Sequence, residues 1–171
     1  QFASEIHFRP GEFPVAKGQF IALSGNTGAS KGPHIHLEMH KTKSNNLCDP
    51  LNFLKSFIKD KTAPAVYSFK SYPQPGKGVF QHSPESRIFT FDKGRCQAWG
   101  KVGFGIRAND HMDSVYNNYG VRYTRLYCDG KLVFASDVNN IPVSCNRMVN
   151  SWGDYDHFLH TKIWFMKSFI E

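Results

Sequence analysis

Polar side chains recur at every second position near the start of the chain, at His34, His36, Glu38 and His40. The residues between them, Ile35, Leu37 and Met39, are apolar. Successive side chains of a β-strand point to opposite faces, so this alternation predicts a strand over 34–41 with the histidines on one face. Residues two apart lie roughly 6.5–7 Å apart along a strand. Two imidazoles that lean together can therefore reach one metal ion, and zinc accepts histidine nitrogen. A strand whose histidines simply face water has the same pattern.

The segment before this strand is rich in residues that favour turns. Three glycines recur in it, Gly25, Gly28 and Gly32. Glycine permits tight turns and positive φ, and Pro33 restricts the residue before it to extended geometry. We therefore expect the loop to deliver His34 to the strand in one fixed position. Glu38 either orients one of the histidines or is a solvated strand residue, and His40 is expected at the surface.

The motif SGNTGASKGPHIHLEM, followed by DPLNFL, closely resembles the closing motif of the M23 family of zinc metallopeptidases, the lysostaphin-like or LytM-type endopeptidases. The family pattern is G-N-T-G-x-S-x-G-P-H-L-H-F-E, and Ile35 and Leu37 are conservative departures from it. Lys17-Gly18-Gln19 and the apolar run up to Gly25 also match the family's approach to the motif. The resemblance covers roughly residues 1–58.

The resemblance implies a role for each histidine of the pair. His36, the second His of H-x-H, would be a zinc ligand, and His34 would be the catalytic His beside the scissile carbonyl. The family completes its site with a His and an Asp in an H-x-x-x-D motif and with a further catalytic His. His7 does not match that motif, so we expect these elements upstream of Gln1. This chain alone is then expected to be inactive, because catalytic zinc sites usually need three protein ligands.

For the intact protein, the resemblance implies a zinc-dependent endopeptidase. Its substrate would be a peptide cross-link or stem peptide of bacterial peptidoglycan, and its location the cell envelope, periplasmic or extracellular. An alternative is a non-catalytic M23-like protein that binds the cell wall or activates a hydrolase. A β-rich adhesion module with a chance H-x-H would have to explain sixteen residues of agreement with the motif.

Composition narrows the possible partners. The formal net charge is +7 and the pI is about 9.3, which favours anionic surroundings such as a cell wall. The basic residues are scattered without a cluster, so we expect no nucleic-acid partner. No apolar run reaches eighteen residues, so we expect no transmembrane segment in this chain. The four cysteines have wide spacings and no CxxC, which leaves buried thiols or one or two disulfides open.

Extended segments dominate the expected secondary structure, so the fold should be mainly β. Residues 17–24 read as a buried strand, and residues 51–58 as a short helix after the N-cap Asp49 and Pro50. Further strand-like runs occupy residues 66–72, 87–91, 100–109, 120–128 and 131–135. Asp129-Gly130 between the last two suits a type I′ hairpin turn. Residues 160–170 fit either a strand or a short helix.

These elements suggest two domains. Residues 1–58 would be the C-terminal part of an antiparallel β-sheet M23 peptidase domain, and residues 59–64 a linker. Residues 65–171 would be an Ig-like β-sandwich, either complete or cut short, similar to one that follows the M23 domain in some Bacteroidetes proteins. The phrases WGKVGFGIRANDHMD, NNYGVRYTRLYCDGKLVFAS and NSWGDYDHF carry this second resemblance. Its expected role is binding or spacing, with envelope proteins among the possible partners.

Two features of this half have competing interpretations. The acidic stretches around Asp110 to Asp113 and Asp154 to Asp156 could supply oxygen ligands to calcium, but acids that cap turns and strand ends are the more ordinary reading. The three tryptophans, Trp99, Trp152 and Trp164, could be carbohydrate platforms, but such residues more often pack in a core or interface.

Overall fold

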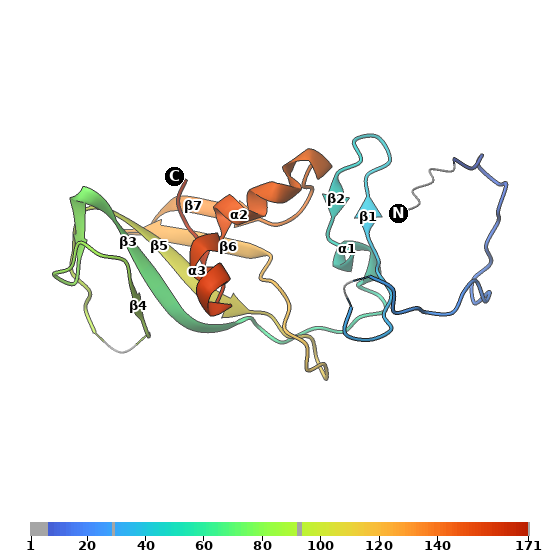
Figure 1. Ribbon diagram of the computed structural model, residues 1–171, viewed down its shortest axis with the longest axis horizontal. Coiled ribbons are helices and arrows are strands. Elements are labelled where there is room, and N and C mark those ends of the chain that lie inside the picture. Colours follow the sequence, from blue (N-terminus) through green and yellow to red (C-terminus); the bar gives the residue numbers. More distant parts are fainter. Residues whose placement is uncertain (1–6, 29, 92–93, 171) are drawn as a thin grey trace. The chain divides into compact units, whose positions relative to one another are not determined.

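The computed structural model describes residues 7–28, 30–91 and 94–170. The chain divides into two compact units, Gln1–Leu37 and Glu38–Glu171, which are treated separately below. The fold is mainly β, with three antiparallel sheets and a few short helices (Figure 1). No helix among the described residues is long and apolar enough to cross a membrane.

The first unit contains neither helix nor strand over its described residues 7–28 and 30–37. The strand predicted over residues 17–24 is therefore wrong, and of the one predicted over 34–41 only Met39–His40 is a strand. The apolar side chains of this unit are open to solvent, with Leu23 86% and Ile35 84% exposed. A strand forms only where a second strand pairs with its backbone, and the described part of this unit provides none.

The second unit begins with a small hairpin and one helical turn. Strand β1 (Met39–His40) pairs antiparallel with β2 (Leu47–Cys48). Helix α1 (Leu51–Leu54) follows, shorter than the predicted 51–58, and turn hydrogen bonds continue the coil to Ile58. The N-cap is Pro50 rather than the predicted Asp49, and it makes no side-chain cap hydrogen bond. Asp49 lies one residue earlier, where its Oδ1 accepts the Leu51 N–H at 2.9 Å in an Asx-type turn.

A four-stranded antiparallel sheet in the order β4-β3-β5-β8 forms the body of this unit. Its strands are β3 (Ala65–Phe80), β4 (Arg87–Phe89), β5 (Ala98–Asn109) and β8 (Met166–Lys167). Strand β3 runs well past the predicted 66–72, because its pairing with β5 resumes at Gly78 after a register shift. Cβ atoms at Gly78 and Gly100 would overlap backbone of the facing strand, so only glycine allows the two strands this close approach.

A separate two-stranded sheet is formed by β6 (Tyr123–Cys128) and β7 (Lys131–Asp137). The predicted type I′ turn is confirmed, since Asp129 and Gly130 both have positive φ, of 49° and 76°. The helices η1 (Val143–Met148), α2 (Val149–Trp152) and α3 (Tyr155–Thr161) precede β8. Residues 160–170, which suited strand or helix, therefore contain the end of α3 and β8.

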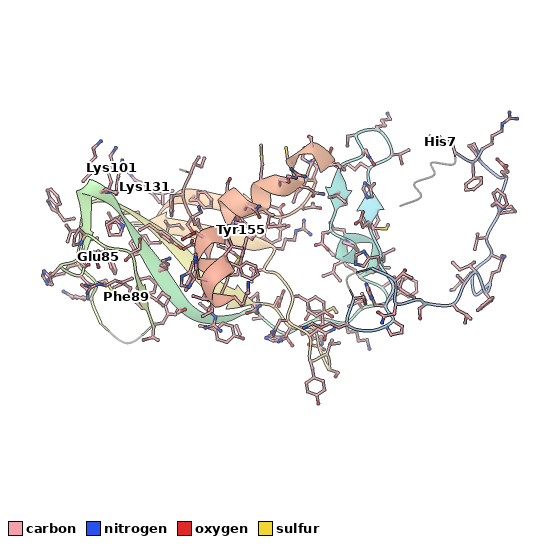
Figure 2. All side chains as sticks on the ribbon, in the orientation of Figure 1. His7, Glu85, Phe89, Lys101, Lys131 and Tyr155 are labelled. Carbon is pink, nitrogen blue, oxygen red and sulfur yellow. The ribbon has the colours of Figure 1, made fainter. Side chains whose placement is uncertain are left out.

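Phenylalanines form the centre of the larger sheet. Phe69 on β3 stacks on Phe89 of β4 at 5.3 Å between ring centroids, and Phe80 meets Phe104 edge-on at 5.4 Å. Figure 2 labels Phe89. Phe165, just before β8, is fully buried. Edge-to-face and offset pairs of this kind stabilise beyond their buried area.

The structure bears on two alternatives that the sequence left open, the role of the tryptophans and the state of the cysteines. Trp152 and Trp164 are half-buried and lie 6.3 Å apart, as the packing interpretation expected, whereas Trp99 is 71% exposed. All four cysteines lie within the described residues and are free thiols, but none is buried as the thiol alternative expected, since Cys48 and Cys145 are half-buried and Cys96 and Cys128 are exposed.

Residues 47–52 are tied to the sheets of the same unit. Arg122 donates to Asp49 Oδ2 at 2.7 Å and to Asp137 Oδ1 at 3.0 Å, and Leu47 forms a β-bridge with Ile141. The predicted domain boundaries, with one domain ending at residue 58 and the next beginning at residue 65, stay predictions. The predicted Ig-like sandwich also stays a prediction.

Candidate active site

The two histidines singled out by the sequence lie side by side. The ring centroids of His34 and His36 are 5.2 Å apart with an interplanar angle of 66°, an edge-on arrangement. Both side chains are exposed, so both are accessible to a ligand from solvent. The contact satisfies the expectation that the two imidazoles share a side, although the backbone that carries them is not in a strand.

A short polar network holds the His34 ring. Its Nδ1 lies 3.0 Å from Ser30 Oγ and 2.9 Å from the Gly32 carbonyl oxygen. Ser30 Oγ in turn donates to the same carbonyl at 2.7 Å and accepts the Gly32 N–H at 3.2 Å. A carbonyl oxygen only accepts, so Nδ1 must carry a proton to make a favourable contact with it. In the neutral ring, the lone pair therefore resides on Nε2.

The glycines of the preceding loop contribute unequally. Gly28 has φ +82°, in the region that glycine tolerates best, and its carbonyl accepts the Ser30 N–H at 3.1 Å. Gly25 and Gly32 do not adopt this conformation, so the expected use of positive φ holds at one of the three positions. We expected the loop to fix the position of His34, but the sequence did not indicate that Ser30, four residues earlier in the motif, would contact its ring.

Glu38 and His40 form a separate pair. Glu38 Oε2 lies 3.0 Å from His40 Nε2, and the Asn45 carbonyl lies 3.2 Å from His40 Nδ1. These hydrogen bonds, first to Glu38 and then to Asn45, raise the pKa of His40 above its ordinary value. Both roles left open for Glu38 are seen in part, since its side chain is 62% exposed to solvent and its carboxylate contacts one of the histidines of the pattern, His40. His40 lies at the surface as expected.

The histidine pair fits part of a zinc site. Imidazole nitrogen is a common zinc ligand, and the two imidazoles are exposed and lie side by side. Catalytic zinc sites usually have three protein ligands. Within residues 7–28, 30–91 and 94–170, no group of three or more His, Cys, Asp or Glu side chains is placed to hold a metal ion.

The acidic stretches of the second unit have protein partners. Asp113 Oδ1 accepts the Thr62 hydroxyl at 2.7 Å and the Lys61 N–H at 3.2 Å, and these bonds lower the pKa of Asp113. Asp154 caps α3 by accepting the His157 N–H at 3.2 Å. Both carboxylates thus have the capping roles of the more ordinary interpretation.

Asp154 is also the centre of a cluster that the sequence did not indicate. Its Oδ2 accepts from Lys70 Nζ at 2.6 Å and from the Tyr72 hydroxyl at 2.8 Å, and the Lys70 and Asp154 side chains are largely buried. Burial alone would raise the pKa of Asp154, but the bonds from Lys70, Tyr72 and the His157 N–H outweigh it and lower that pKa. Burial, followed by the nearby Lys70 charge, lowers the pKa of His157. The cluster links strand β3 to Asp154, the N-cap of α3.

Comparison with known proteins relates the chain to a metalloprotease. It is 69% identical over 26 residues to a Haemophilus influenzae protein named "Uncharacterized metalloprotease". The matched stretch is 15% of this chain and 6% of the relative, so the chain spans a small fraction of that protein's length. No family model matches the chain. No solved structure matches it either.

Proposed function

We propose that this chain carries the closing part of the active site of a zinc-dependent, M23-type endopeptidase. The single observation that carries the proposal is the His34–His36 pair, with one ring oriented through Nδ1 by Ser30 and Gly32. The match to a metalloprotease supports a peptidase role, and the motif resemblance supports the finer assignment. The remaining ligands, a His and an Asp, would come from a part of the whole protein upstream of Gln1.

In this proposal the two histidines have different tasks. His36 would hold the zinc ion, which when bound supplies a Lewis acid that polarises a peptide carbonyl and acidifies water. His34 would act on the substrate, because its Nδ1–H is anchored and its Nε2 lone pair is left to accept a proton. Once protonated, Nε2–H could donate to the carbonyl oxygen. Ser30 and Gly32 would keep this ring from rotating away.

The proposed substrate is a peptide cross-link or stem peptide of bacterial peptidoglycan, which places the protein in the cell envelope. The net charge of +7 supports attraction to an anionic wall. The β-rich second half would bind or space the enzyme relative to wall and envelope partners.

The test uses the whole protein that contains this chain and measures both zinc content and cleavage of purified peptidoglycan. We expect His36→Ala to lose zinc and activity together. We expect His34→Ala to lose activity about a hundredfold or more while retaining much of the zinc. His40→Ala is the matched control, because His40 pairs with Glu38 and should leave both readouts unchanged. Zinc and activity that survive His36→Ala would refute the proposal.

The second candidate is a non-catalytic wall-binding or hydrolase-activating protein. The observation that favours it is that the described residues supply two clustered imidazoles and no third ligand. It predicts that the whole protein sediments with peptidoglycan in the presence of a zinc chelator and releases no fragments from it. Zinc-dependent release of fragments would exclude it.

A further inference from the structure

An apolar cavity of about 500 Å³ lies in the second unit between the four-stranded sheet and strand β6. Its apolar lining includes Phe69, Phe104, Ile106 and Met166 from the larger sheet, and Phe91, which follows β4. Phe91 remains 55% exposed, so this surface is not covered by the described chain. Ligand-binding cavities commonly have this size and apolar character.

The way β6 borders the cavity is informative. Four consecutive residues of β6, Tyr123, Thr124, Arg125 and Leu126, line it, whereas no residue of β7 does. Alternate side chains of a strand point to opposite faces, so a cavity against one face would touch every second residue. Contact with all four is the pattern expected where a cavity borders the backbone of β6 as well as the side chains of one face, over roughly 10 Å.

This edge of β6 is open. The strand pairs with β7 on one side, and on the other side no strand adjoins it in the described part of the chain. The Val138 N–H donates to the Arg122 carbonyl at 3.0 Å, so Arg122 directs its polar backbone groups toward β7. Because these groups alternate along a strand, Tyr123 and Arg125 direct theirs toward the open edge.

We propose that the open edge of β6 binds an extended peptide segment of a separate protein as an added strand, whose alternate apolar side chains enter the phenylalanine-lined cavity. The added strand would satisfy the Tyr123 and Arg125 backbone groups, and its apolar side would cover Phe91. Arg125 is the one charged residue of the lining, and its side chain forms no ion pair among the described residues. The peptide therefore has acidic residues on its solvent side.

The experiment uses the 171-residue chain and a fluorescein-labelled peptide, TVEVTVEV, whose binding is followed by fluorescence anisotropy. Its counterparts are TVKVTVKV, which reverses the charge, and TVEPTPEV, which cannot pair as a strand. We expect TVEVTVEV to bind, TVKVTVKV to bind about threefold to fivefold more weakly, and TVEPTPEV not to bind.

Substitutions at the two edges of the hairpin identify the surface. Arg125→Pro removes an edge N–H and a charge, and it should weaken binding about tenfold or more. Arg125→Ala removes only the charge, and it should weaken binding about threefold to fivefold. Ala135→Pro is the matched control, because Ala135 faces Arg125 in the register and directs its N–H away from β6. It should change binding by less than about twofold.

Hydrogen exchange of the unmodified chain tests the proposal even if Arg125→Pro fails to fold. The Tyr123 and Arg125 amides should become protected on adding TVEVTVEV, while the Ala135 amide should not. Three results would overturn the proposal: no binding of TVEVTVEV, an equal loss on Ala135→Pro, or protection of the two amides by self-association of the chain without peptide. Equal binding of TVEPTPEV would also overturn it, because the cavity would then accept apolar groups without strand pairing.

Discussion

The residues around the histidine pair and the sheets of the second unit show opposite relations between sequence and structure. Residues 7–28 and 30–37 contain the most distinctive motif, yet they form no strand or helix and leave large apolar side chains exposed. The sheets have no comparable motif, but they have a defined register and an aromatic core. A chemical motif can therefore be recognised in the sequence even where the described residues around it form no packed core.

The largest expected effect is in the buried ion pair of the second unit. Lys70→Met would leave Asp154 without its ammonium partner in a largely buried position, so unfolding free energy should fall by about 3 kcal/mol. Urea denaturation measures the loss. Asp156→Asn, at a carboxylate that is 91% exposed, is the control and should change little. An equal effect of both variants would contradict the assigned role of the Lys70–Asp154 pair.

Glycine-to-alanine substitutions distinguish tightly packed positions from positions that face open space. A Cβ atom at Gly153 would overlap the Trp164 ring, so Gly153→Ala should cost about 1–3 kcal/mol. Gly120→Ala in the same unit and Gly25→Ala in the first unit meet no atom within 4 Å, so neither should destabilise the chain. Thermal unfolding of the three variants is the measurement. A loss at Gly25 equal to that at Gly153 would mean that the first unit is as tightly packed as the second.

The pH dependence of stability provides a smaller effect. The pKa of His157 is lowered in the folded chain, so the unfolded chain binds a proton more readily. Stability linked to His157 is therefore present above its ordinary pKa of 6.5 and is lost as the pH falls through that value. Unfolding midpoints in urea between pH 8 and pH 5 should show this decline. His157→Phe should reduce it, and His160→Phe, on the exposed side of α3, should leave it intact.

The smallest effect concerns the Glu38–His40 pair. Glu38→Gln should lower the pKa of His40 toward 6.5, because it removes the negatively charged acceptor of the His40 hydrogen bond. Proton NMR titration of the His40 ring measures this change, and Glu12→Gln, distant in the sequence, serves as the control. An unchanged His40 titration would show that Glu38 is not its partner in solution.

Local signals were sufficient for most of the second unit. Alternating runs and the Asp129-Gly130 turn predicted the strands between residues 65 and 137, because each such run finds a nearby antiparallel partner. The extension of β3 to Phe80 depends on the close approach of Gly78 and Gly100, which only the paired structure reveals. The mostly apolar run over residues 17–24, predicted as a buried strand, is not one, because no partner strand is present in the described chain.

The candidate site was predicted in part. Spacing placed His34 and His36 together, and the structure brings their rings to 5.2 Å. The Ser30 contact was missed because it depends on the fold of the loop rather than on strand alternation. The Lys70–Asp154 cluster joins residues 84 positions apart in the chain, a separation over which periodicity carries no information.

The most direct test of the central claim is zinc K-edge X-ray absorption of the whole protein that contains this chain. We expect nitrogen scatterers at about 2.0–2.1 Å from the zinc ion, with imidazole outer shells. We also expect the loss of one imidazole, or of the zinc itself, in His36→Ala but not in His40→Ala. A zinc spectrum that is identical in the unmodified protein and in His36→Ala would contradict the claim that this histidine pair belongs to a zinc site.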